Sequence, residues 1–489
     1  MSPRAISFLA VVACLCSTAI FVRRAADAWS AVNVAPGVAL TSGFEEESLF
    51  AAYRGVHGQP IYQEGTRLPY ASAYFNWLFY ATTASAVKPF HGADNPASLI
   101  RAARLFTAVG SVAGLAILWW FGRRLIPHGS VVAMAIAMAV FFSPLVGWWA
   151  HTVRPDVWAL ACEASALVVL LVGFRRHPVA AVLLAMAWFY AAWAFKPTYV
   201  FGLGAAVVFL LVRRQFKAAA VLAIGSAGLW AATYAWLGSA YRSAMNDTAV
   251  TNVFYLSGGS QNLLNAAAKS VPLLLLVAML GWKSVREKNE ATASLPDDAR
   301  WLGGIGVVAA TLLGFITSCK LGAASNYFFT ALLMSGLLAL GQLARNPPRG
   351  QLAVFLVLTI ALQFLVFCGK VGTIDLRPAE DQLAARWSVW ERQPEPRFSA
   401  DTRLNLPWLS PHSPPLVLAF NYPLQRAQGR PFEAGGVGGM IAKGYFAALL
   451  LPAGDLKDYD GAPLSLYRKD REIAGMSVYL RTAANPSAP

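Results

Sequence analysis

The chain has 489 residues, of which 57% are hydrophobic and 13% are charged. Soluble proteins usually carry about a quarter charged residues, so this composition excludes an ordinary soluble enzyme and indicates a protein dissolved in lipid. The net charge of +15 comes from short clusters of arginine and lysine between apolar runs, which argues against a nucleic-acid-binding surface and fits the positive loops of membrane proteins.

Eleven apolar runs are long enough, or nearly so, to cross a membrane, because a spanning helix needs about 20 mostly apolar residues. In chain order the runs cover residues 5–22, 102–122, 130–148, 157–174, 179–195, 198–213, 217–237, 268–283, 301–319, 326–343 and 351–369. We therefore predict an all-α polytopic membrane protein of about eleven transmembrane helices.

Loop charges predict how these helices are oriented. Arginine and lysine cluster in alternate loops, near residues 123, 175, 213, 283 and 345, and such loops face the cytoplasm. The N-terminus is then cytoplasmic and the C-terminal tail extracytoplasmic, and the alanine- and arginine-rich usage suggests a bacterial plasma (inner) membrane. Arg23 and Arg24 disagree, since they follow the first span on the predicted outer side. A signal peptide cleaved near Ala25 is an alternative for the first run.

The long first loop, residues 23–100, lies on the predicted outer side and contains no further span. Its stretches 45–56 and 70–87 place apolar residues on one helical face, which is the pattern of helices that lie flat on a membrane surface. We therefore expect two surface helices in this loop.

The tail, residues 371–489, is richer in proline and acidic residues than the rest of the chain. Its short apolar runs at 416–420, 447–451 and 477–480 predict strands separated by turns. We therefore expect a transmembrane domain over 1–370 and a small soluble α/β domain over the tail.

Three consecutive carboxylates stand at the start of the first surface helix, in the run Gly43-Phe44-Glu45-Glu46-Glu47. Like charges on neighbouring residues repel one another, so the grouping brings no structural gain of its own. These carboxylates could supply a general base, a metal ligand, or both. A solvated helix N-terminus, where acidic residues favour the helix dipole, explains the cluster equally well.

Three further polar stretches lie in predicted outer loops. The first is His151-Thr152-Val153-Arg154-Pro155-Asp156, in which Asp156 at a membrane boundary needs solvent or a partner such as Arg154. The second is Lys196-Pro197, whose ammonium either extends to the interface or meets a lipid phosphate. The third is the hairpin from Lys320 to Tyr327. Since these stretches and the glutamates share one face, we expect a site there.

Several common signatures are absent from the sequence. It has no Walker-type phosphate loop, no dinucleotide-binding fingerprint and no His-Glu-x-x-His motif. Its five cysteines lie in or beside apolar runs, which predicts neither a disulfide framework nor a zinc site. The glycine-rich run 435–439 predicts a flexible turn. Glu163 is the main ionisable residue within the spans, which argues against an ion-coupled carrier.

Several short motifs follow one another along most of the chain. They are Glu45-Glu46, Gly58-Gln59-Pro60-Ile61-Tyr62, Tyr74-Phe75-Asn76, Arg101-Ala-Ala-Arg104, Arg154-Pro155-Asp156, Lys196-Pro197 and Asn326-Tyr327. In this ordered series the chain resembles the GT-C superfamily of membrane glycosyltransferases, in the bacterial branch that includes protein mannosyltransferases and aminoarabinose transferases. Gly444-Tyr445-Phe446 before an apolar run also resembles the small outer domain of many members.

This resemblance implies an enzyme that takes a sugar from a polyprenyl-phosphate donor at the outer face of the plasma membrane and passes it to an acceptor in the envelope. We expect a single displacement in which a carboxylate takes the proton of the acceptor hydroxyl. Negative charge then develops on the departing lipid phosphate, where a cation stabilises it. The expected partners are the lipid-linked donor, the unknown acceptor and membrane lipid, without nucleic acid.

The resemblance also implies roles for particular residues. The first acid of the family, usually the Asp of an Asp-Glu pair, falls on Glu45 or Glu46, and the second acid falls on Asp156. The phosphate-binding role falls on Lys196 or Arg154. Further candidates for substrate binding are Tyr62, Asn326 and Tyr327. A divalent cation, Mg²⁺ or Mn²⁺, held by Glu46 and Asp156 is the cofactor that would suit these acids.

Two other classes of function compete with the enzyme. A flippase or transporter of lipid-linked glycans predicts charged residues within the spans and broken helices, which the sequence does not have. A non-catalytic membrane scaffold predicts a tail that functions alone and an acidic cluster without effect. Replacing Glu45 and Asp156 and measuring sugar transfer or transport separates these classes from the transferase.

Overall fold

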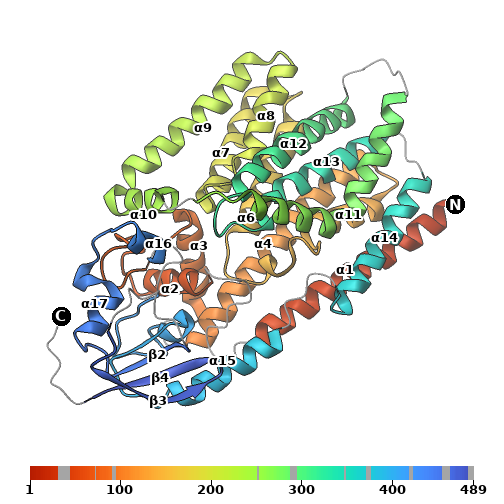
Figure 1. Ribbon diagram of the computed structural model, residues 1–489. Helices are drawn as coiled ribbons and strands as arrows, with labels where there is room; N and C mark the ends of the chain where they lie inside the picture. Colours follow the sequence, from red (N-terminus) through yellow and green to blue (C-terminus); the bar gives the residue numbers. More distant parts are fainter. Residues whose placement is uncertain are drawn as a thin grey trace.

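The structure is a computed structural model that describes residues 1–30, 45–71, 73–90, 95–250, 253–286, 294–345, 349–370, 376–417, 422–453 and 463–482. Helices make up most of it and form one bundle, and a small sheet packs at one end of this bundle (Figure 1). Gly43 and Phe44, at the start of the acidic run, lie outside the described residues.

Each of the eleven predicted spans overlaps one α-helix. They are α1 (Pro3–Ser30), α4 (Pro96–Leu125), α5 (Ser130–Phe141), α6 (Asp156–Gly173), α7 (Pro178–Phe195), α8 (Phe201–Val212), α9 (Phe216–Trp236), α11 (Leu256–Arg286), α12 (Leu295–Ser318), α13 (Phe329–Arg345) and α14 (Arg349–Phe367). Among the described residues, nine helices are long and apolar enough to cross a membrane, whereas α5 and α8 have only 12 residues each. The chain is a multi-pass membrane protein, and the count of eleven crossings stays a prediction.

Prolines place two of the polar residues at helix ends. Pro155 directly precedes α6, so Asp156 is the first residue of that helix. Pro197 disfavours a helical conformation at Lys196, which is extended at φ −146° and ψ 122° and ends α7. Because both residues stand at ends of apolar helices, their charged side chains meet polar loops and not lipid.

Three of the five predicted cytoplasmic loops lie together at one end of the bundle. Arg175, after α6, and Arg213, after α8, both pair with Asp298 in the first turn of α12. The Nη1 atom of Arg345, in the last turn of α13, lies 2.9 Å from Oδ1 of Asp297. Since successive helices alternate in direction, the sheet and the first loop are at the opposite end (Figure 1).

Small residues let the helices of the bundle approach closely. A methyl group added at Gly110 of α4 would lie 2.8 Å from the ring of Trp158, and one added at Gly114 would collide with Phe141. The glycine pair therefore serves helix packing.

The first loop contains α2 (Glu45–Val56), α3 (Trp77–Val87) and the short helix η2 (Lys88–Phe90). The prediction for α2 is confirmed in its bounds, whereas α3 begins seven residues later than predicted. Residues 45–52 are all buried, so α2 lies between the bundle and the tail and not on an exposed surface. Shorter elements elsewhere are η3 (Gly147–Ala150), α10 (Gly238–Val250) and η4 (Ser325–Phe328).

The tail combines a four-stranded sheet with short helices. The strands β1 (Arg397–Ser399), β2 (Ala448–Pro452), β3 (Tyr467–Ile473) and β4 (Met476–Arg481) have the order β1-β2-β4-β3, in which only β1 and β2 are parallel. The helical elements are α15 (Leu376–Trp390), η5 (Thr402–Asn405), α16 (Tyr422–Ala427), η6 (Glu433–Gly435) and α17 (Gly436–Ala442). The tail is therefore a small α/β unit.

Two of the three predicted strands are confirmed, as β2 and β4. The prediction at 416–420 is wrong for Leu416 and Val417, which are irregular, and residues 418–420 lie outside the described range. The strand β3 escaped prediction because its residues are largely charged and exposed. The prediction of a flexible turn at 435–439 is also wrong, since α17 begins at Gly436.

The first loop and the tail share hydrophobic clusters. Tyr70 packs with Phe398, Tyr422 and Phe432 of the tail. Phe50 of α2 packs with Leu406, Leu409 and Val417. These contacts explain why the stretch before Trp77 is not helical, because Tyr70 must reach the core of the tail.

Candidate functional site

The three adjacent glutamates turn toward three different surroundings. Glu45 faces the bundle, where Nε and Nη2 of Arg104 donate to its two oxygens at 2.9 and 3.1 Å. The backbone N–H of Val153 donates to the same carboxylate at 3.1 Å. Both side chains of the ion pair are buried, at 4% exposure for Arg104 and 0% for Glu45. This bidentate pair holds the start of α2 against α4 and the loop before α6.

Glu46 faces the tail. The hydroxyl of Thr402, in η5, donates to Oε1 of Glu46 at 3.1 Å. Its other oxygen, Oε2, is buried and has no hydrogen-bond partner in the described part of the chain. Burial raises the pKa of Glu46 above its ordinary value, while its own backbone amide, Arg403 and Thr402 favour the ionised form. Glu46 therefore joins α2 to the tail through one of its two carboxylate oxygens.

Glu47 faces α3, where its charge acts on the hydroxyl of Tyr80. The separate orientations of the three carboxylates follow from helix geometry, since successive side chains on an α-helix diverge by about 100°. The repulsion expected from three adjacent charges is thus reduced, because each has its own partners.

Arg154 brings the acids together. Its guanidinium is buried, and the charges of Asp156, Glu45, Glu46 and Glu47 all act on it. Burial lowers the pKa of Arg154, and the four carboxylates oppose that shift. The guanidinium carbon also lies 5.6 Å from the ring centroid of Trp149. The first loop and the start of α6 therefore meet around one cation.

Asp156 is held by residues from two other helix ends. The ammonium of Lys196 lies 2.6 Å from Oδ1 of Asp156, and Nδ2 of Asn326 donates to the same oxygen at 2.8 Å. Its second oxygen, Oδ2, is buried without a hydrogen-bond partner among the described residues. All three residues came from the predicted outer loops, and the structure brings them into direct contact.

The ring of Tyr327 lies close to two ammonium groups. Nζ of Lys196 is 5.6 Å from its ring centroid and Nζ of Lys320 is 5.4 Å from it. Burial lowers the pKa of Lys320, and no carboxylate pairs with this lysine in the described part of the chain. Lys320 therefore carries a charge without a counter-ion beside the Asp156 cluster.

Tyr62 lies one layer behind this cluster. Its hydroxyl donates to the carbonyl oxygen of Phe75 at 2.8 Å, and the Phe75 ring centroid lies 5.9 Å from Nζ of Lys196. The Tyr62 ring packs edge-on against Tyr80 and Tyr241. Tyr62 therefore supports Phe75 and does not itself contact the acids.

Of the two arginines that disagree with the loop charges, Arg23 is exposed and Arg24 is not. Arg24 is buried, its guanidinium lies 5.7 Å from the ring centroid of Trp148, and its Nη2 has no hydrogen-bond partner among the described residues. The ring of the neighbouring His151 packs at a tilt against Phe21, and burial lowers the pKa of His151 to about 3, so it is neutral. Arg24 points into the protein and so does not act as a loop charge that orients the helices.

The two acids named as metal ligands do not form a fitting donor set. Glu46 faces Thr402, whereas Oδ1 of Asp156 already contacts an ammonium and an amide. Within the described ranges, no three His, Cys, Asp or Glu side chains are grouped so that they could hold a metal ion. The side-chain cations of Arg154 and Lys196 already act on these acids.

Glu163, within α6, has a structural environment. Thr330 donates to its Oε2 at 2.6 Å and the backbone N–H of Gly202 donates to Oε1 at 2.8 Å. A side chain at position 202 would collide with this carboxyl group. Glu163 therefore joins three helices through its two carboxylate oxygens.

Comparison with known proteins identifies the fold. No protein-family model matches the sequence, and no curated protein matches it either. The apo crystal structure of ArnT from Cupriavidus metallidurans is similar at a TM-score of 0.60 and 15% identity, with 96% of this chain and 99% of that chain covered. The chain has the GT-C fold. ArnT bound to undecaprenyl phosphate matches this GT-C fold over the same shares at a TM-score of 0.59 and 15% identity.

Three residues that contribute to the site of this GT-C fold were not predicted as site residues from the sequence. Arg104 was quoted only as part of a motif, and its pairing with Glu45 spans 59 residues. Lys320 was quoted only as the start of a hairpin. Thr402 gave no signal in the sequence, because a lone threonine in a tail 356 residues from Glu46 carries no pattern.

Proposed function

We propose that the chain is a membrane glycosyltransferase that transfers a sugar from a polyprenyl-phosphate carrier to an acceptor hydroxyl at the non-cytoplasmic face of the plasma membrane. The near full-length likeness to ArnT supports this proposal, because one of its structures holds undecaprenyl phosphate. The N-terminus is then cytoplasmic and the tail extracytoplasmic, with the basic loops at the opposite end of the bundle from the acids.

One observation carries the proposal. Four carboxylates from α2 and α6 gather around the buried guanidinium of Arg154, at the end of the bundle that also holds Lys196 and Lys320. Burying so many charges costs free energy, and a scaffold would gain nothing from it. Such a mixture of acids and cations suits a reaction in which a proton leaves one oxygen and negative charge appears on another.

Glu46 is the proposed base. In the transfer step the acceptor oxygen forms a bond to the anomeric carbon while its proton passes to Oε2 of Glu46. The bond between that carbon and the phosphate oxygen breaks, and the lipid phosphate leaves with the electron pair. Glu45 is a weaker candidate, since Arg104 and Val153 already occupy its oxygens.

Lys196 and Lys320 are the proposed stabilisers of the departing phosphate. Both lie close to Tyr327, and Lys320 has no carboxylate partner among the described residues, so its charge remains available for an anion. Asp156 and Asn326 position the ammonium of Lys196. Arg154 holds the acids in place. No step is assigned to a metal ion.

The test is a reconstituted transfer reaction. The full-length protein in lipid nanodiscs is mixed with polyprenyl-phosphate-linked sugars and an envelope extract, and mass spectrometry measures donor consumption and new glycans. Comparing envelopes with and without the gene then identifies the modified component. We expect the wild type to consume a donor and Glu46→Gln to fail. If the gene changes only the side of the membrane on which the lipid-linked sugar is found, the transporter class is correct.

A further inference from the structure

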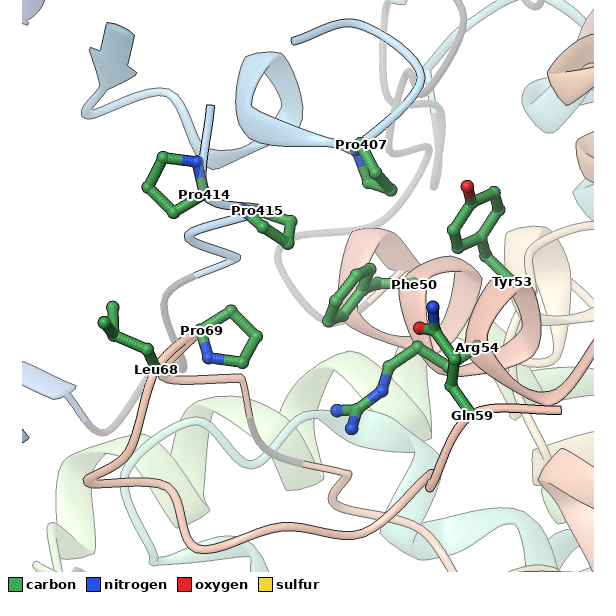
Figure 2. Close-up of a pocket in the computed structure, with 9 residues that line it drawn as sticks. All are labelled: Phe50, Tyr53, Arg54, Gln59, Leu68, Pro69, Pro407, Pro414 and Pro415. Carbon is green, nitrogen blue, oxygen red and sulfur yellow. The ribbon is translucent and has the colours of Figure 1, made fainter. Parts of the chain in front are cut away.

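A pocket of about 410 Å³ lies between the first loop and the tail, outside the cluster of acids and lysines (Figure 2). Its walls are mostly apolar and rich in rings, contributed by Phe50, Tyr53, Leu68, Pro69, Pro407, Pro414 and Pro415. Two polar residues, Arg54 and Gln59, complete the lining. Pockets of this size hold small molecules, and they often lie where two structural units meet.

Arg54 gives this apolar pocket a positive charge. The residue is nine-tenths buried, and its Nη1 donates to Oε1 of Gln63 at 2.9 Å. The guanidinium carbon lies 5.7 Å from the ring centroid of Phe50. No carboxylate pairs with Arg54 in the described part of the chain, and burial lowers its pKa. An anion in the pocket would offset this desolvation.

The pocket is aligned with the proposed base. Glu46, Phe50 and Arg54 are spaced four residues apart on α2 and so lie on one face of the helix. At 1.5 Å per residue, Phe50 stands about 6 Å and Arg54 about 12 Å along the helix axis from Glu46. Residues 402–406 of the tail run along this face of α2, since Thr402 donates a hydrogen bond to Glu46 and Leu406 packs in one cluster with Phe50.

We propose that this pocket binds the acceptor, and that the acceptor carries a phosphate or carboxylate next to an apolar or ring-shaped portion. The anion pairs with Arg54 and the apolar portion lies against Phe50 and the prolines. The acceptor hydroxyl then lies toward Glu46, about two helical turns from Arg54 along α2. This inference rests on the proposed glycosyl transfer only for the role of the ligand; the anion site itself can be tested without turnover.

The binding test uses two probes with the purified full-length protein, in nanodiscs and with saturating undecaprenyl phosphate to fill any donor site. Octyl phosphate represents a lipid-borne anion and glucose 6-phosphate a soluble phosphorylated sugar. Isothermal titration should detect one of them, with an affinity that falls at least tenfold in Arg54→Gln and largely returns in Arg54→Lys. Tighter binding of octyl phosphate indicates a lipid-borne acceptor, and tighter binding of glucose 6-phosphate indicates a soluble one.

Arg67→Gln is the matched control, since Arg67 lies in the same loop but is exposed and pairs with Glu64. Neutral octyl glucoside controls for the apolar contribution and should bind wild type and Arg54→Gln equally. The inference is overturned if neither probe binds the wild type, or if Arg54→Gln binds them as tightly as Arg67→Gln does. If Arg54→Gln unfolds at nearly the same temperature as the wild type, misfolding is excluded. If Arg54→Gln does not fold, the affinity of Arg54→Lys still tests the site.

Turnover separates this inference from the proposed function. Once an acceptor is known, Arg54→Gln should raise the KM for the acceptor at least tenfold and leave the KM for the donor unchanged. A wild-type protein that transfers no sugar refutes the proposed function, while the probe titrations still report on the pocket. If the protein transfers sugar but the KM for the acceptor is the same in the wild type and in Arg54→Gln, only the pocket assignment is refuted.

Discussion

Lys196 and Asp156 stand 40 residues apart at the ends of α7 and α6, yet Nζ of the lysine lies 2.6 Å from Oδ1 of the aspartate. Both side chains are buried. Removing one partner of such a pair leaves a buried charge alone, which costs about 3–5 kcal/mol, whereas neutralising both costs much less. We expect Lys196→Gln and Asp156→Asn each to lower the free energy of unfolding strongly. The double variant should lose less of this free energy than the two single losses added together. Additive effects in denaturant titrations would contradict this pairing.

Glu46→Gln should reduce the transfer rate by about 100- to 10,000-fold, because general base catalysis contributes that much and the amide accepts no proton. The measurement is the single-turnover rate with bound donor. Glu64→Gln is the control, since Glu64 lies in the same loop but is half exposed and pairs with Arg67. If Glu46→Gln transfers sugar at the wild-type rate, the base is another residue.

The pH dependence of transfer should report on Glu46. Burial raises its pKa, and the base must be ionised, so activity rises with pH through a midpoint above that of a free glutamate. Thr402→Val removes a hydrogen bond to the ionised form, which moves this midpoint to higher pH. Thr402→Ser keeps the hydroxyl and should restore the wild-type profile. Arg403, Asp401 and Arg154 also face Glu46 and are unchanged in both variants. An unmoved midpoint in Thr402→Val refutes this coupling.

Arg104→Lys should destabilise the protein although it keeps the charge. The guanidinium reaches both oxygens of Glu45 and also donates to the carbonyl oxygen of Ala28 at 2.7 Å, which an ammonium cannot reproduce. We expect a loss of about 2–4 kcal/mol, measured as a lower unfolding midpoint in detergent. Arg101→Lys, at a half-buried neighbouring site where Nε donates to the carbonyl oxygen of Trp29 at 3.4 Å, should change stability less. Equal stabilities of the two variants would count against the structural role of Arg104.

Lys320→Gln should weaken the binding of undecaprenyl phosphate about 10- to 100-fold, since a hydrogen bond to a charged group contributes about 1.5–3 kcal/mol. Titration of the lipid into the protein in nanodiscs measures this affinity. Lys443→Gln, at an exposed position of the tail, is the control. Unchanged affinity in Lys320→Gln would assign the phosphate to other cations.

The prediction of α2 succeeded because its signals are local. Acidic residues stand in its first turn and an apolar pattern follows within the same stretch, so neighbours in the sequence are neighbours on the helix. The prediction of α3 began too early, because Tyr70 is drawn into the core of a tail more than 300 residues away. Local periodicity contains no information about that contact.

Arg24 and the three glutamates also show which features local sequence patterns predict and which depend on packing. Counting loop charges treats every arginine as solvated, but the side chain of Arg24 lies inside the protein beside Trp148. Likewise, three adjacent glutamates are equivalent in the sequence, and only packing distinguishes Glu45, bound to Arg104, from Glu46, whose second oxygen has no partner among the described residues.

The sequence by itself determined that the chain dissolves in a membrane, where its helices run and which polar residues stand at one face, because hydropathy and helix signals act over a few turns. Only the tertiary structure decided that Asp156 meets Lys196 and Asn326, that Glu46 meets Thr402, and that a charged pocket opens beside α2. The reason is physical: short-range hydrogen bonds and buried charges depend on distances in space, and these partners lie 40 to 356 residues apart along the chain.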